Sequence, residues 1–379
     1  MGITLSHSSA LHAHRTLRFS QTDWRSLNHA ELSKAKPWVG KRWGKLQFTE
    51  KHWCWQVPSA ACKLDVLVGN QRDRIRMQTV CNHVCSSALP NGSVLWLDEH
   101  ANVVSPSLMF VQMAEIISLP ALVLLGYELC GNYARTPDNP ARGAVLDHIP
   151  AITSVGELQE YVDAVVGLTG ITKARLAFQY ISDHALSAPE GLLATMYSLP
   201  IDELGYGLGP VTLNERVLVA QDEDPLPGRS KHRYPDITLG IAPVGINYDG
   251  EGHIDFRGLV QAVRLADRLE GDKRLDAQLA LAQKIRSIRE KVVDDNRRDR
   301  ELIVSGRIVF PITKEDLSDD YGLDELTKQI LKTVKYYYGI DTTEYESAFA
   351  NTDLTRDRKS LFEAMWTPGR ADLSSRELW

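Results

Sequence analysis

The stretch RYPDITLGIAPVGINYDGEGHIDF, residues 233–256, contains two runs in which apolar and polar residues alternate. The runs, 234–239 and 244–249, are separated by a short segment of small residues and proline. This pattern predicts two antiparallel strands joined as a hairpin. Asp236 lies at the start of the first run and Asp249 at the end of the second, with Asn247 between them in the chain. We therefore expect these polar side chains at one sheet.

Helical patterns flank the predicted hairpin on both sides. Ser187 followed by Pro189 and Glu190 predicts a capped helix start, which puts Glu190 in the first helical turn. The charged region 259–300 is helical in composition, and Gly306 ends it before a strand-like run at 307–312. Helices alternating with strands predict an α/β unit with a mixed sheet flanked by helices.

The chain divides into three expected regions. A length of 379 residues is enough for two domains with separate cores. Strand-like runs at 63–68 and 93–97, with a helix start at Ser105-Pro106, predict a smaller α/β module first. The following segment is rich in proline, glycine and asparagine up to Pro150 and has loop composition. We therefore expect a module at 1–150, a second domain at 151–325, and a C-terminal helix with a polar tail at 326–379.

The strand ends carry residues suited to a hard divalent cation. Mg²⁺ prefers oxygen ligands, and a bound cation can polarise a phosphodiester and activate a water. Asp236 and Asp249 are the expected metal ligands, Glu190 can approach from its helix, and His253 is a candidate acid, base or ligand. The alternative is that both aspartates bind the local backbone of a hairpin.

These residues, in this order, resemble the restriction-endonuclease-like PD-(D/E)XK superfamily, in the branch around the very short patch repair endonuclease. The similarity continues through a series that covers the expected last helix and strand of the domain: Asp295, Arg298, Asp299, Leu302, Gly306, Val309, Ile312, Thr313 and Asp316. It spans roughly residues 170–320. The resemblance implies a mixed sheet flanked by helices and endonuclease activity on DNA with Mg²⁺ or Mn²⁺, served by Asp236, Asn247, Asp249, Glu190 and His253.

One position departs from that branch. Asn247 stands where the branch usually carries Glu, and an amide oxygen brings no charge and cannot act as a base. Two functions stay open. The first is a metal-dependent nuclease with an attenuated site. The second is an inactive nuclease-fold antitoxin or regulator that binds nucleic acid or a partner protein.

The N-terminal module has a weaker resemblance of its own. The runs Leu64-Asp-Val-Leu67, Ser105-Pro106 and Gly126-Tyr-Glu-Leu-Cys-Gly131 are similar to a domain of proteins related to AbiEi-type abortive-infection antitoxins. This resemblance implies a bacterial protein connected with defence.

The formal net charge of −6 argues against a protein that binds nucleic acid indiscriminately through a basic surface. Basic residues and tryptophans nevertheless alternate in the first fifth of the chain: Arg15, Arg18, Trp24, Arg25, Lys34, Lys36, Trp38, Lys41, Arg42, Trp43, Lys45, Lys51, Trp53 and Trp55. They predict either phosphate and base contacts or a small tryptophan core under a basic rim. The segment 284–300 offers a similar choice between a phosphate-binding helix and a helix covered with salt bridges.

The cysteines and the longest apolar run bear on location and metal binding. Five cysteines without a secretory leader favour a reducing cytoplasm. The run 108–125 contains Gln112, Glu115 and Pro120, so it predicts a buried helix rather than a membrane span.

Cys81, His83 and Cys85 are spaced like metal ligands. Zinc needs four ligands, and no second Cys/His pair stands nearby, so the sequence favours buried thiols and a lone histidine.

Overall fold

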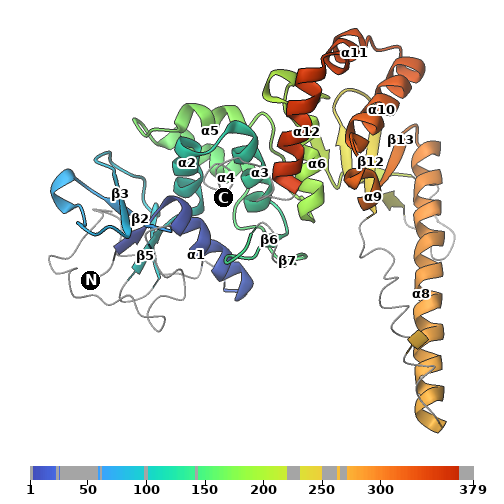
Figure 1. Ribbon diagram of the computed structural model, residues 1–379, viewed down its shortest axis with the longest axis horizontal. Coiled ribbons are helices and arrows are strands. Elements are labelled where there is room, and N and C mark those ends of the chain that lie inside the picture. The colour runs from blue at the N-terminus through green and yellow to red at the C-terminus, as the bar shows by residue number, and fades with distance from the viewer. Residues whose placement is uncertain are drawn as a thin grey trace. The chain divides into compact units, whose positions relative to one another are not determined.

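The computed structural model describes residues 3–22, 25, 59, 62–97, 101–140, 144–219, 231–249, 263–264 and 271–366. The chain forms two compact units (Figure 1). The first contains Met1–Val211 together with Thr352–Trp379, and the second contains Thr212–Asn351. Helices and mixed sheets occur in both, which confirms the predicted α/β class with mixed sheets flanked by helices.

The units differ from the expected ranges 1–150, 151–325 and 326–379. The loop near residue 150 stays within the first unit, because Arg18 donates a hydrogen bond to the Pro150 carbonyl and Ile152 N–H donates to the Leu129 carbonyl. The last helix, α12 (Thr352–Trp366), contacts α6 (Ala188–Ser198) of the first unit. Loop composition therefore marked a turn inside a unit rather than a boundary.

The first unit contains a five-stranded sheet in the order β3-β2-β1-β5-β4. Its strands are β1 (Ile3–Leu5), β2 (Leu64–Val68), β3 (Val80–Val84), β4 (Val94–Trp96) and β5 (Ala101–Val104). The central strand β1 is antiparallel to β2 and parallel to β5, while β2 and β3 are parallel. A 3₁₀ turn at Gln71–Asp73 and a small ribbon of β6 (Ala134–Arg135) and β7 (Val145–Leu146) complete the unit's minor elements.

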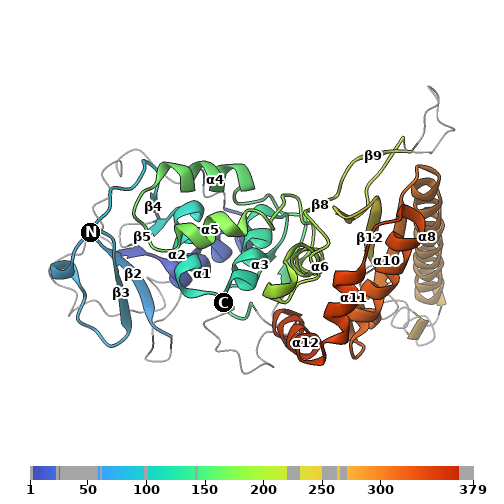
Figure 2. The same cartoon turned by 90° about the horizontal axis from the view of Figure 1, so that it is seen from above.

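A helical layer packs beside this sheet (Figure 2). It comprises α1 (His7–Phe19), α2 (Pro106–Ile116), α3 (Leu119–Cys130), α4 (Val155–Ala164), α5 (Ile171–Ala177) and α6, followed by a 3₁₀ turn at Ile201–Glu203. The apolar run 108–125 is two helices, because Ser118 caps a new helix start by accepting the Ala121 N–H. Among the described residues, we find no helix with the length and apolar character that crossing a bilayer requires.

Buried polar contacts tie α1 to α3 in the first unit. Arg15 donates through Nε and Nη2 to the two carboxylate oxygens of Glu128, at 2.8 and 2.6 Å, and both side chains are almost fully buried. Burial alone would raise the pKa of Glu128, but the charges and hydrogen bonds of Arg15 and Arg135 together lower that pKa. Arg18 donates to the carbonyls of Glu128, Gly131 and Pro150. These two arginines are therefore internal and do not form an exposed basic rim.

The second unit is built on a four-stranded sheet in the order β13-β12-β11-β8. The strands are β8 (Val211–Leu213), β11 (Ile237–Leu239), β12 (Val244–Asp249) and β13 (Ile308–Thr313). β12 is antiparallel to β11 and parallel to β13. A ribbon of β9 (Val217–Leu218) and β10 (His232–Arg233) and the helices α8 (Gly271–Val304), α9 (Lys314–Ser318), α10 (Gly322–Tyr338) and α11 (Thr343–Ala350) surround it.

Helix α8 connects the parallel strands β12 and β13 and has 34 residues. Its C-terminal part contacts β10 and β13. Figure 1 shows its N-terminal part continuing well past the sheet of the same unit. A large share of its surface is therefore exposed.

A buried histidine in the first unit predicts how acid destabilises the fold. His14 lies 2.8 Å, through Nε2, from the Val104 carbonyl, and burial lowers its pKa from 6.5 to about 4. The unfolded chain therefore binds the proton more tightly. Each pKa unit corresponds to about 1.4 kcal/mol, so the contribution of His14, on the order of 3 kcal/mol, is fully present above pH 6.5 and disappears as the pH falls to about 4.

Urea unfolding from pH 7.5 to 4 measures this contribution. We expect His14→Gln to show a clearly weaker loss of stability across that range than the wild type, while His148→Gln, which changes an exposed histidine, keeps the wild-type dependence. Equal pH dependence of His14→Gln and wild type would contradict the assignment.

Candidate functional site

The predicted hairpin is present as β11 and β12. Ile237 pairs with Ile246 and Leu239 pairs with Val244 in antiparallel register. All four of these side chains are buried in the core of the second unit. The alternation of apolar and polar residues thus placed the hairpin correctly, and with it the position of Asp236 just before β11.

Hydrogen bonds across the hairpin join Asp236 to Asn247 and to Tyr248. The Asp236 N–H donates to Asn247 Oδ1 at 3.2 Å, and the Asp236 carboxylate accepts the Tyr248 N–H at 2.6 Å. Asn247 has an exposed fraction of only 1% and also donates through Nδ2 to Asp299 Oδ1, at 3.1 Å. Asn247 therefore bridges the hairpin and helix α8.

Asp299 is the residue of this network that the sequence did not assign to the site. The sequence placed it in the series that resembles the last helix and strand of the nuclease family, without a role at the site. Its carboxylate also lies 3.6 Å from Nε of Arg298. A signal was present in the chain, because an asparagine at a buried strand position needs a polar partner from a covering element. Only the folded register shows that this partner is Asp299.

The other predicted site residues are Asp249, Glu190 and His253. Asp249 ends β12, opposite Thr313 of β13, and is half-buried. Glu190 lies in the first unit, where its carboxylate accepts hydrogen bonds from Ser187 Oγ at 2.7 Å and the Leu186 N–H at 3.0 Å. Glu190 thus takes part in capping the N-terminus of its own helix, α6. His253 lies outside the described residues, and its role stays a prediction.

The geometry bears on where a metal ion could bind. Within the described ranges, one set of three His, Cys, Asp or Glu side chains brings its ligand atoms within 4.8 Å of one another: Asp65, Cys81 and His83 in the first unit. Asp236 and Asp249 do not form such a set with a third described carboxylate. Binding of Mg²⁺ or Mn²⁺ by Asp236 and Asp249 stays a prediction.

The acidic residues near the C-terminal end of α8 are paired. Arg233 of β10 donates to Glu301 at 2.6 Å and lies 3.2 Å from Asp294. Arg298 lies 3.6 Å from both Asp295 and Asp299. The salt bridges predicted for this helix therefore exist, but they involve Arg298 and an arginine from outside the helix.

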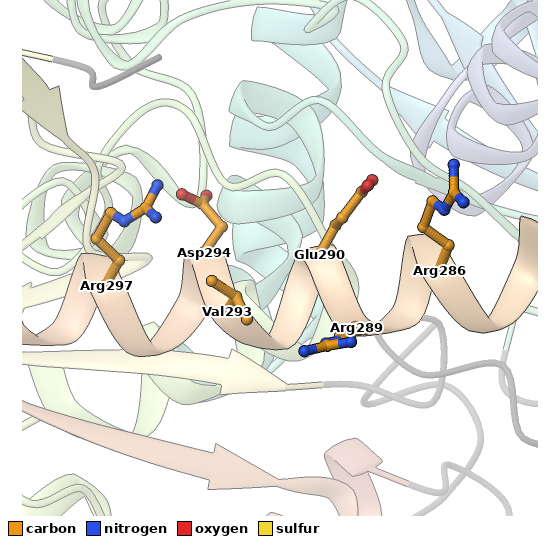
Figure 3. Close-up of a pocket in the computed structure, with 6 residues that line it drawn as sticks. All are labelled: Arg286, Arg289, Glu290, Val293, Asp294 and Arg297. Carbon is orange, nitrogen blue, oxygen red and sulfur yellow. The ribbon is translucent and has the colours of Figure 1, made fainter. Parts of the chain in front are cut away.

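Five other basic side chains of α8 differ from Arg298 in their pairing. In the described part of the chain, no ion pair involves Arg286, Arg289, Lys291, Arg297 or Arg300. A pocket of about 560 Å³ lies along the helix and is lined by Arg286, Arg289, Glu290, Val293, Asp294 and Arg297. Figure 3 shows Arg286 and Arg297 projecting to the same side of α8, with Arg289 pointing the other way.

Comparison with known proteins gives no further guide to this site. No family model, curated protein or solved structure matches the chain. The function is therefore argued from the contacts, charges and burial of its own residues.

Replacing the bridging amide tests its structural role. Asn247→Glu removes the donor to Asp299 and puts a second carboxylate in its place at a buried position. An uncompensated buried charge is strongly destabilising, so we expect the free energy of unfolding to fall by about 3 kcal/mol in urea titrations.

Two comparisons make this measurement decisive. Asp299→Asn should recover a large part of the loss in the double variant, because it removes the like charge. Mn²⁺ should stabilise neither wild type nor Asn247→Glu through this position. A rise in melting temperature with Mn²⁺ that is specific to Asn247→Glu would instead show that the position is a working metal site.

Proposed function

We propose that the second unit is a nuclease-like module that binds DNA along α8 and does not cleave it. The observation that carries this proposal is the difference in ion pairing between the acidic and the basic residues of α8. Arg233 and Arg298 pair with the acidic residues Asp294, Asp295, Asp299 and Glu301, while five basic side chains of α8 form no ion pair with any described residue. An acidic chain thus presents a local basic surface.

The spacing of the basic side chains suits a phosphate backbone. From Arg286 to Arg297, the helix rises about 16 Å, which is roughly half a turn of B-DNA. Guanidinium groups bind phosphate through a planar pair of donors, and such contacts position a protein on DNA independently of base sequence. Of the two acids that line the pocket, Asp294 is paired with Arg233, and the three arginines of the lining outnumber the two acids.

Binding without cleavage follows from the use of the polar groups at the hairpin. Both functional groups of the Asn247 amide take part in hydrogen bonds, and the Asp236 carboxylate accepts a backbone N–H. Asn247 also contributes no charge toward a cation. Within the second unit, the order β11, β12, α8, β13, α9 is the order of elements expected from the resemblance to nucleases, and it supports the term nuclease-like.

DNA binding measured without metal tests the proposal. Fluorescence anisotropy with a labelled duplex in the presence of EDTA should show binding by the wild type. The double variant Arg286→Gln/Arg297→Gln should bind about tenfold more weakly, because counterion release drives such binding and two phosphate contacts are removed.

A charge-matched control separates the helix from overall charge. Lys332→Gln/Lys335→Gln removes two positive charges from α10 and should bind like wild type. Plasmid incubated with Mg²⁺ or Mn²⁺ should stay intact. Metal-dependent nicking that is lost in Asp236→Ala would overturn the proposal in favour of an active nuclease, and equal weakening in both double variants would exclude α8 as the DNA site.

A further inference from the structure

We propose that Asp65, Cys81 and His83 form a zinc site in the first unit, independent of the proposed DNA binding. The three residues come from the adjacent parallel strands β2 and β3. Asp65 pairs with Cys81, and Leu67 pairs with His83. Because side chains alternate along a strand, the register places all three on the same face of the sheet.

The ligand atoms converge closely enough for one ion. They lie within 4.8 Å of one another, and His83 Nε2 is 2.8 Å from Asp65 Oδ1. The side chains of His83 and Asp65 are 22% and 16% exposed, so the site is shielded yet reachable from solvent. Sulfur, imidazole nitrogen and carboxylate oxygen are the three ligand types that zinc accepts.

Neighbouring residues hold the site in place. The imidazole of His7 stacks on that of His83 with ring centroids 3.6 Å apart, and His7 itself is 2% exposed. The Asp65 N–H donates to Ser9 Oγ at 2.9 Å, and the Ser6 N–H donates to the Asp65 carbonyl at 3.0 Å. The start of α1 thus fixes the backbone of Asp65 and the ring of His83, as outer partners do around metal ligands.

The arrangement favours a cation over a nucleophilic cysteine. In a Cys–His–Asp catalytic triad the imidazole stands between the thiol and the carboxylate, so that one relays to the other. Here the Cys81 sulfur and the Asp65 oxygen are close to each other as well as to His83. A thiolate beside a carboxylate is stabilised by a divalent ion, which binds as the thiol proton leaves to solvent. Three protein ligands leave the fourth zinc position to water.

Metal titration of the whole chain tests the proposal. The protein is treated with chelator under reducing conditions and then titrated with Co²⁺ and Zn²⁺. We expect one Co²⁺ per chain, with thiolate charge-transfer absorption and intense visible bands of a four-coordinate site, and displacement by Zn²⁺. Cys81→Ser should abolish the charge-transfer band, and His83→Gln and Asp65→Asn should each weaken Zn²⁺ binding at least about 100-fold, since even outer partners contribute 10–100-fold.

Matched cysteines provide the control. Cys85 lies just beyond the same strand, but its sulfur bonds toward the Ser87 carbonyl and lies outside the group, and Cys62 is exposed. Cys85→Ser and Cys62→Ser should keep wild-type affinity and spectrum, and circular dichroism establishes that each variant is folded. A wild type that binds no more Co²⁺ than folded Cys81→Ser, or a charge-transfer band lost in Cys85→Ser instead, would overturn the proposal.

Discussion

The buried amide of Asn247 is the contact on which the second unit depends. A polar side chain inside a sheet is tolerated only when its groups are satisfied, and this one accepts from Asp236 and donates to Asp299. The two bonds fix the hairpin against the C-terminal part of α8. In the proposed function, the same residue that stabilises the unit brings no charge toward a cation.

Buried charge organises the first unit in a comparable way. The Arg15–Glu128 pair lies out of solvent with two hydrogen bonds, and Arg18 satisfies carbonyls at the end of α3. Removing one partner would leave the other charge buried and uncompensated, so the stability of the fold depends on both residues. Arg15 and Arg18 thus serve packing, whereas the basic and tryptophan residues predicted at 34–55 lie outside the described residues. The functional proposal centres on the exposed basic side chains of α8.

Local patterns predicted local structure well. The Ser187 cap with Glu190, the Ser105-Pro106 helix start and the hairpin are present because each depends on a few neighbouring residues. Contacts between distant segments could not be read in this way. Asn247 and Asp299 are 52 residues apart, and Asp65 meets Cys81 only through the register of two parallel strands. The assignment of α12 to the first unit is a further example, because the composition of the chain before this helix does not predict it.

The salt dependence of DNA binding tests the central claim most directly. Each phosphate contact contributes a slope of about −0.9 to the plot of log Kobs against log salt concentration, because each releases condensed counterions. If α8 binds phosphates through Arg286 and Arg297, the slope for Arg286→Gln/Arg297→Gln should be smaller in magnitude than that of wild type by about 2. An unchanged slope, or a wild-type affinity that does not vary with salt, would contradict the account.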